Sequence, residues 1–392
     1  MKIYFYMTTI LEHGGGFENS FIDIANGLNQ IDNIEIEIVT MDERFTKRLG
    51  YLLSIYFRTN LNKNPLHRES SEKIRERLNG VKYTKARSFK ELKNKLSEAD
   101  VIYAKNEMIE TSIIKFILKP NKLPPIVLLC GTTLFYPEPK SLEFKLHNLL
   151  YTGLVYKFLT NFVSQFHVKN SSDEAILNKL HRNKMVIKIY NPFDFDKFRN
   201  NAIKLNFELN EPSKYNIIWT GRLEQQKGIV DLIEIVNALN NNHINSIAWN
   251  IAGEGNEKSA ILGLCDKWKN VHYYGHVNNI YIPSMLKGGD LFITTSKAES
   301  FGNNIVEANA LDLPAIAYRI PGPEEIIEQG LNGLMVDSQE SFIAAISSCV
   351  EGKQQFSNPA EVVTTKFNKE KIYIETLNAI KSVVTREEYK RA

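Results

Sequence analysis

Residues 219–228 combine two cations with two glycines. This run, WTGRLEQQKG, lies between an apolar stretch and a helical pattern, which places its side chains at the carboxyl edge of a parallel sheet. Arg222 offers a planar fork of donors and Lys227 a compact charge, so the pair suits a diphosphate. A solvated surface pair would use the same residues, and that alternative stays open.

A second run, ESFGNNIVE at residues 299–307, holds two carboxylates eight positions apart. Glu299 lies in an expected loop and Glu307 on the helix that follows it. Backbone N–H groups at such a helix start could face a phosphate or a sugar oxygen. Glu299 could accept hydrogen bonds from sugar hydroxyls and Glu307 from a ribose. Each glutamate could equally be a capping or surface charge.

Three consecutive glycines, residues 14–16, follow the first apolar run and precede the first helical pattern. Glycine lets the backbone approach an anionic group closely, and a helix amino end adds partial positive charge. A tight turn from strand to helix would use the same residues.

The elements that would position these runs alternate along the chain. Apolar strand patterns and helical patterns follow one another twice over, which predicts parallel sheets covered by helices on both faces. We expect an α/β protein with two doubly wound, Rossmann-like domains that face one another across a cleft. The expected parts are a first domain at 1–195, a linker at 196–214, a second domain at 215–366, and a helical segment at 367–392.

The three runs, in this order and spacing, resemble glycosyltransferase family 4, the retaining nucleotide-sugar transferases with the GT-B fold. The Gly-Arg and Lys-Gly pairs of that family's diphosphate loop are matched within residues 221–228. Its motif of two glutamates separated by seven residues is matched by Glu299 and Glu307. Its amino-terminal glycine loop is matched by Gly15 and Gly16. The resemblance covers essentially the whole chain and is loosest over residues 40–125.

The resemblance implies that 1–195 is the acceptor-binding domain, that 215–366 is the nucleotide-sugar-binding domain, and that the helix at 367–392 crosses back to the first domain. It also implies a role for each matched residue. Arg222 and Lys227 would stabilise the departing nucleoside diphosphate, Glu299 would hold the transferred sugar, and Glu307 would bind the ribose. Arg222, Lys227 and Glu299 are therefore the expected catalytic residues, and no metal or other cofactor is expected. The other expected donor-binding residues are Gly15, Gly16, Gly221, Ser300, Phe301, Gly302, Asn303 and Asn304.

One position departs from the family pattern. Family members often carry a histidine at the end of a middle strand of the first domain, near the reacting sugar, and Cys130 occupies that place here. A buried cysteine is usually a small hydrophobic residue, so this strand end need not take part in catalysis. His13 could lie near the donor instead, although a loop histidine is more often solvated.

Composition sets further limits. Hydrophobic residues make up 43% of the 392 residues and charged residues 24%, which is ordinary for a globular protein. The three cysteines are far apart, so we expect neither a disulfide framework nor a zinc site. Asp194 and Asp196 form an Asp-x-Asp pair, but its place at the domain junction argues against a metal site. We expect no membrane-spanning helix and no signal peptide, and hence a cytoplasmic protein.

Positive charge is concentrated in residues 44–95, which hold 15 Lys and Arg against 4 Asp and Glu. Aromatic and aliphatic residues are interspersed with these cations. Such a segment could lie on an anionic membrane surface, which would make the protein peripheral on the inner face of the membrane. It could also bind an anionic acceptor polymer or be a solvated insertion. No nucleic-acid-binding module is present.

We therefore expect a retaining glycosyltransferase that moves a hexose-type sugar from a nucleotide sugar, with a UDP-sugar as the expected donor. The acceptor would be a glycan, lipid-linked, polymer or protein molecule, as in bacterial cell-surface polysaccharide or glycoconjugate assembly. Two alternatives stay open. One is a nucleotide-sugar epimerase or hydrolase on the same fold, which would need a paired acid and base. The other is a non-catalytic subunit of a partner transferase.

Overall fold

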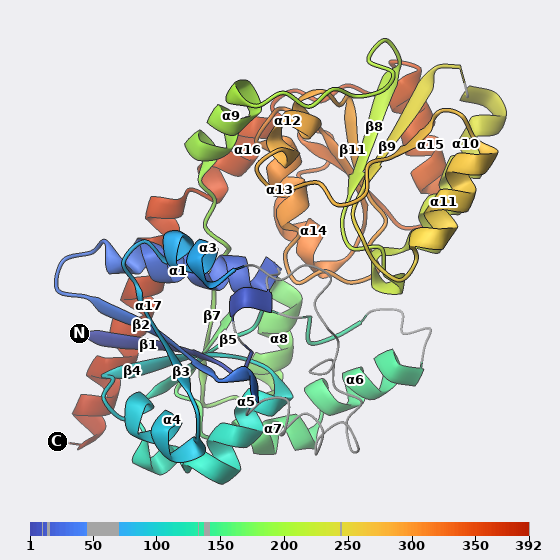
Figure 1. Ribbon diagram of the computed structural model, residues 1–392. Coiled ribbons are helices and arrows are strands. Elements are labelled where there is room, and N and C mark those ends of the chain that lie inside the picture. The colour runs from blue at the N-terminus through green and yellow to red at the C-terminus, as the bar shows by residue number, and fades with distance from the viewer. Residues whose placement is uncertain are drawn as a thin grey trace. The chain divides into compact units, whose positions relative to one another are not determined.

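The computed structural model describes residues 1–9, 11–13, 16–44, 70–131, 133–136, 142–243 and 245–391. The chain divides into two compact units. The first unit comprises Met1–Pro192 and Lys369–Ala392, and the second comprises Phe193–Asn368 (Figure 1).

The first unit is built on a parallel sheet of seven strands in the order β3-β2-β1-β4-β5-β6-β7. Its central strands are almost entirely buried, as expected for a parallel sheet with helices on both faces. The strands are β1 (Lys2–Met7), β2 (Glu35–Met41), β3 (Lys82–Ala86), β4 (Val101–Lys105), β5 (Ile126–Leu129), β6 (Gln165–Val168) and β7 (Met185–Lys188).

Helices pack on both faces of this sheet and form a separate hydrophobic core on each. Figure 1 shows α1 and α17 on one side of the strands, and α4 and α7 on the other. The helices are η1 (Leu11–His13), α1 (Gly16–Asn29), α3 (Ser71–Leu78), α4 (Phe89–Leu96), α5 (Met108–Ser112), η3 (Ile113–Leu118), η4 (Pro120–Lys122), α6 (Leu142–Thr152), α7 (Leu154–Thr160), α8 (Ser171–Leu180) and α17 (Lys369–Arg391).

The second unit contains a parallel sheet of six strands in the order β10-β9-β8-β11-β12-β13. The strands are β8 (Tyr215–Thr220), β9 (Ile247–Ala252), β10 (Val271–Tyr273), β11 (Leu291–Thr294), β12 (Ala315–Tyr318) and β13 (Gly333–Val336). The helices are α9 (Phe195–Lys204), η5 (Gln225–Lys227), α10 (Ile229–His243), α11 (Lys258–Lys267), α12 (Ile282–Lys287), α13 (Asn303–Asn309), α14 (Pro321–Ile326), α15 (Gln339–Val350) and α16 (Pro359–Lys366).

The linker expected at 196–214 is instead part of the second unit. Asp194 caps α9 by accepting a hydrogen bond from the Lys197 N–H (3.0 Å). The helix then packs on α12, and Arg199 Nε donates to the carbonyl oxygen of Ala310 (2.9 Å). Polar residues that suggested a linker are exposed both on this helix, as Asp196 and Lys197, and after it, as Asn206 and Glu208, while Phe195 is buried.

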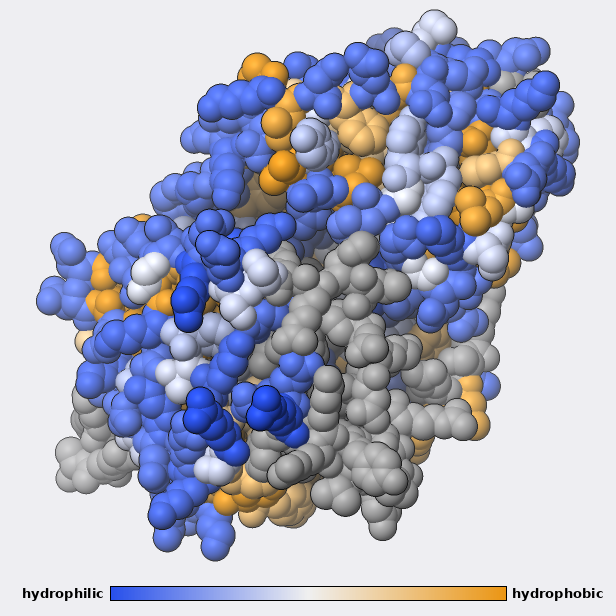
Figure 2. Space-filling model, viewed as in Figure 1, coloured by the Kyte–Doolittle hydropathy of each residue, from blue (hydrophilic) through white to orange (hydrophobic). Residues whose placement is uncertain are grey.

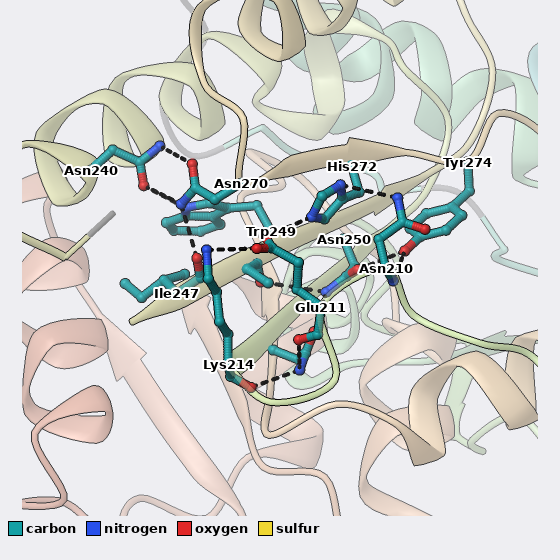
Figure 3. Close-up of polar contacts among 12 residues, drawn as sticks. Asn210, Glu211, Lys214, Asn240, Ile247, Trp249, Asn250, Asn270, His272 and Tyr274 are labelled. Atoms are coloured by element: carbon teal, nitrogen blue, oxygen red, sulfur yellow. Dashed lines mark hydrogen bonds and ion pairs between the residues drawn. The ribbon is translucent and has the colours of Figure 1, made fainter. Parts of the chain in front are cut away.

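Buried amides hold one edge of the second sheet together (Figure 3). The side chains of Asn240 on α10 and Asn270 before β10 exchange two hydrogen bonds, of 2.9 and 3.1 Å. Trp249 Nε1 donates to Asn240, and Asn270 donates to the carbonyl oxygen of Ile247. These bonds hold α10 against β9, which is the strand beside β8 in the sheet.

The carboxyl-terminal helix α17 belongs to the first unit. Ile380 and Val383 are buried in the same hydrophobic cluster as β1, and the Tyr373 ring covers Gly27 of α1. Arg386 donates to the side chain of Gln165 on β6 (2.7 Å). Within the described ranges, no helix is long and apolar enough to cross a membrane.

Candidate active site

The loop after β8 carries Arg222 and Lys227 to the carboxyl edge of the second sheet. The Gly221 N–H donates to the Ala252 carbonyl (3.1 Å), so the loop begins beside the end of β9. Leu223 is fully buried and anchors the middle of the loop. Gly228 ends η5 at φ +68°, a conformation that favours glycine, and a Cβ there would overlap the Thr295 carbonyl oxygen.

A second loop, residues 295–302 after β11, packs directly on the first. The hydroxyl of Thr295 donates to the Lys227 carbonyl (2.8 Å), and the Lys297 N–H donates to the Gln226 carbonyl (2.9 Å). Gln226 in turn donates to the Ala298 carbonyl (3.2 Å). Three hydrogen bonds therefore join the two loops that the sequence singled out.

Lys227 and Glu299 meet where these loops join. The Lys227 ammonium forms an ion pair with the Glu299 carboxylate, which also accepts a hydrogen bond from the Ser296 hydroxyl (2.9 Å). The two charged side chains retain 17% and 15% of their exposure, so solvent screens the pair only partly. The arrangement holds an ammonium group and a carboxylate ready for a ligand with both anionic and hydroxyl groups.

Arg222 lies further toward solvent. Its guanidinium pairs with Glu224 of the same loop (3.1 Å), and 63% of the side chain is exposed. This fork of donors is therefore accessible to an anion, whereas Lys227 is held in place by its partner.

Helix α13 follows the second loop and carries Glu307. Gly302 precedes the helix with φ +109°, and Asn304 donates to the carbonyl oxygen of Thr220 at the end of β8 (3.3 Å). Glu307 is partly buried, and this burial raises its pKa to about 7. Ser300, like Asn303 and Asn304, retains partial exposure, whereas Phe301 is buried against the ring of Phe367.

The expected residues of the first unit are less fully described. Gly15 lies outside the described residues, Gly16 begins α1, and His13 ends η1. Cys130 directly follows β5 and is completely buried. Asn106 Nδ2 donates to its sulfur (2.9 Å), and burial raises the pKa of the thiol well above its usual value. Cys130 is therefore a neutral core group in this structure.

Sequence reasoning missed two buried ionisable residues, Lys169 and Asp173, whose charges act on Cys130. Lys169 follows β6 directly and donates to the Tyr190 carbonyl (3.4 Å), while Asp173 accepts from Asn170 (2.9 Å). Burial lowers the pKa of Lys169 to about 7 and raises that of Asp173 to about 6. The sequence signal was a lysine immediately after a strand, at the edge where parallel sheets bind ligands.

No group of three or more His, Cys, Asp or Glu side chains is placed to hold a metal ion among the residues that the structure describes.

Comparison with known proteins links this geometry to a family. Residues 202–362 match the family model for Glycosyl transferases group 1. The uncharacterized glycosyltransferase MJ1607 of Methanocaldococcus jannaschii is 27% identical over 210 residues, which cover 50% of this chain and 53% of that protein. The lipopolysaccharide core biosynthesis glycosyltransferase LpsD of Rhizobium meliloti is 31% identical over 127 residues, which cover 31% of this chain and 34% of LpsD. The chain thus spans about a third to a half of the length of the curated relatives it matches.

The similarity of fold extends over both units. The structure of Anabaena Alr3699/HepE in complex with UDP and glucose superimposes with a TM-score of 0.73 at 19% identity, covering 97% of this chain and all of that one. Both sheets, their parallel strands and their covering helices are therefore shared with a solved protein. The chain has the GT-B fold, and its residues 202–362 carry the domain described by the model for glycosyl transferases group 1.

Proposed function

We propose that this chain transfers a hexose-type sugar from a UDP-sugar to an acceptor, with retention of the configuration at the anomeric carbon. The observation that carries the proposal is the Lys227–Glu299 pair, held by two joined loops at the carboxyl edge of the second sheet. The group 1 domain model supports the reaction class, and the complex of HepE with UDP and glucose supports the donor. The resemblance to family 4 motivates retention.

The chemistry assigned to these residues is charge stabilisation. The bond between the anomeric carbon and the diphosphate oxygen breaks, and its electron pair stays with the diphosphate. Lys227 and the exposed Arg222 neutralise the charge that develops there, and such stabilisation usually lowers the barrier more than any other single effect. As the acceptor oxygen bonds to the anomeric carbon, Glu299 holds hydroxyls of the sugar.

The remaining donor contacts come from the loop before α13 and from the helix itself. Glu307 accepts hydrogen bonds from the ribose, and the segment from Ser300 to Asn304 lines the diphosphate and the sugar. Gly15 and Gly16 are also proposed as donor-binding residues, on the resemblance alone. With two cations at the leaving group, we expect no divalent metal to be needed.

The acceptor is a glycan, a lipid-linked sugar, a polymer or a protein. Bacterial polysaccharide or glycoconjugate assembly is the expected setting. The relatives support this range, because they include an enzyme of lipopolysaccharide core biosynthesis and a peptide N-acetylglucosaminyltransferase subunit.

The direct test is the double variant Arg222→Ala, Lys227→Ala. UDP release from UDP-glucose and UDP-N-acetylglucosamine is measured with and without EDTA, after a thermal-shift screen has selected the donor that binds. We expect the double variant to lose at least about 10²-fold in kcat/KM. EDTA should leave the wild-type rate unchanged. Lys267→Ala, at the carboxyl end of α11, is the control for loss of a lysine elsewhere in the second unit.

Three outcomes would contradict the proposal. Undiminished turnover in the double variant would remove these cations from the reaction. An epimerised nucleotide sugar among the NMR-identified products would favour the epimerase alternative. Turnover that appears only after addition of a partner protein would favour a non-catalytic subunit.

A further inference from the structure

Two consecutive helices of the first unit present large apolar side chains to solvent. Each of these side chains is at least half exposed, and two of them are more than four-fifths exposed. We call this surface the α6–α7 apolar face, and its residues are Leu142, Leu146, Leu149, Leu154, Val155 and Phe158.

The exposed side chains are additional to those that hold the helices in place. Tyr151 at the end of α6 and Tyr156 on α7 are buried in the hydrophobic core. On α6 the three exposed leucines follow a spacing of four and then three residues, which gathers them on one side of the helix. Both α6 and α7 therefore have exposed apolar side chains in addition to the buried ones that pack in the core.

The apolar surface continues onto η3. The ring of Phe116, which is 59% exposed, lies 6.2 Å from the ring of Phe158. Figure 2 shows orange surface at the lower edge of this unit and at the outer end of α6 as drawn in Figure 1. Single exposed leucines are ordinary, whereas a group spread over three neighbouring elements marks an interaction site.

Lysines border this apolar face. Lys145 and Lys157 are exposed, and each stands three residues after the first leucine of its helix. Lys115 lies over the Phe158 ring, with its nitrogen 4.0 Å from the ring centre. In sequence, residues 113–161 contain six lysines and two glutamates, which is an excess of positive charge.

We propose that the α6–α7 apolar face docks the protein on an anionic lipid bilayer. Its leucines and phenylalanine enter the boundary between headgroups and acyl chains, and its lysines pair with lipid phosphates. Charge favours this occupant over a second copy of the chain. A second copy would bring the same lysines to the interface, and they would repel one another.

This surface differs from the basic segment 44–95. Residues 45–69 lie outside the described residues. In the described remainder, Lys82 pairs with Glu35, Lys85 with Glu12, and Lys95 with Glu37. Those cations are partly neutralised within the unit, whereas Lys145 and Lys157 border exposed leucines.

Co-sedimentation of the full chain with vesicles tests the proposal, whichever donor the chain uses. Vesicles of phosphatidylglycerol and phosphatidylcholine are compared with phosphatidylcholine alone. The apolar variant carries Leu142→Gln, Leu146→Gln, Leu149→Gln and Leu154→Gln. The charge variant carries Lys145→Glu and Lys157→Glu. The matched control replaces exposed apolar residues of other surfaces: Ile203→Gln, Val230→Gln and Ile374→Gln.

We expect the wild type and the control to bind the anionic vesicles, and both other variants to bind at least about tenfold more weakly. All changed side chains are exposed, so thermal melting should stay near that of the wild type. Unchanged vesicle binding by the apolar variant, or no binding by the wild type, would overturn the proposal. Light scattering that shows a dimer, lost in the apolar variant, would identify a second copy as the occupant and also overturn it.

Discussion

Glu307 carries a carboxyl group whose proton is bound more tightly in the folded chain than in the unfolded chain, because burial raises its pKa to about 7 from 4.5. The stability that depends on a protonated Glu307 is fully present below pH 4.5 and is lost as the pH rises toward 7. In the variant Glu307→Gln, the glutamine has nearly the shape of the protonated glutamate and is uncharged at every pH. We expect the variant to gain about 1–3 kcal/mol in unfolding free energy over the wild type between pH 4.5 and pH 8.

Urea denaturation at pH 5 and pH 8, followed by tryptophan fluorescence, measures this difference. Glu340 is the control, because hydrogen bonds from its own backbone N–H and from Ser338 lower its pKa. Glu340→Gln should therefore lower the unfolding free energy, whereas Glu307→Gln should raise it. Equal pH dependence of the wild type and Glu307→Gln would contradict the prediction.

Single residues also mark the limit of what the sequence could predict. The order and spacing of Lys227 and Glu299 predicted a shared site, and the structure brings the two together in an ion pair. The exposure of Arg222 depends on Glu224, which no pattern singled out. Lys169 was missed because a buried lysine is rare and its burial follows from packing rather than from local sequence.

Among the elements, η5 depends on a left-handed residue at its end. We expect Gly228→Ala to cost about 1–3 kcal/mol, because φ is +68° and the added methyl group would push against the Thr295 carbonyl. The two loops would then separate, and the thermal shift produced by UDP should shrink with the loss of stability.

Gly263→Ala is the matched control for this element. Gly263 lies on α11, and nothing stands within 4 Å of the added Cβ. Alanine there should stabilise the second unit by about 0.5–1 kcal/mol, since it favours the helix. A Gly228→Ala chain that melts and binds UDP like the wild type would contradict the prediction.

The Asn240–Asn270 pair fixes α10 to β9 (Figure 3). Asn270→Ala leaves the Ile247 carbonyl and the Asn240 amide without their buried partner, which should cost about 1–3 kcal/mol. Asn241→Ala, on the exposed side of the same helix, should change stability little. Urea unfolding of both variants measures this difference. Equal midpoints would show that the amide pair does not stabilise the second unit.

Whether a strand could be predicted depended on its run of apolar residues and not on its position in the sheet, since the edge strands β7 and β10 were predicted. Central strands such as β1 and β8 are nearly continuous apolar runs, and the sequence predicted them. Strands β3, β6 and β13 were missed. β3 is mostly polar, the buried strand β6 contains Gln165 and His167, and β13 is only four residues long and begins with a glycine. The alternation of isoleucines with Glu35 and Glu37 predicts a partly exposed strand, but β2 is buried next to β1. Glu37 is accommodated there by an ion pair with Lys95.

At the scale of the whole molecule, the first unit is formed from both ends of the chain. Ending the chain at Asn368 removes α17 and uncovers the apolar side of α1. We expect the first unit's calorimetric transition to fall sharply or disappear. All three tryptophans lie in the second unit, so the fluorescence transition should remain in place.

The single variant Ile380→Ala tests the same contact without truncation. Loss of this fully buried side chain should lower the unfolding free energy by about 2–4 kcal/mol, again only in the first unit. A truncated chain whose two transitions match those of the full chain would show that α17 does not stabilise that unit.

The discontinuity of the first unit has a consequence for biosynthesis. During translation Met1–Pro192 leave the ribosome before the second unit, yet the helix that completes their core is made only after that unit. The inserted segment Phe193–Asn368 can mature in the meantime, with its two ends already paired through the Phe193 N–H and the Phe367 carbonyl (3.1 Å). The segment Met1–Pro192 therefore reaches its native state after the unit that follows it in the sequence, and until then it exposes apolar surface that a chaperone could shield.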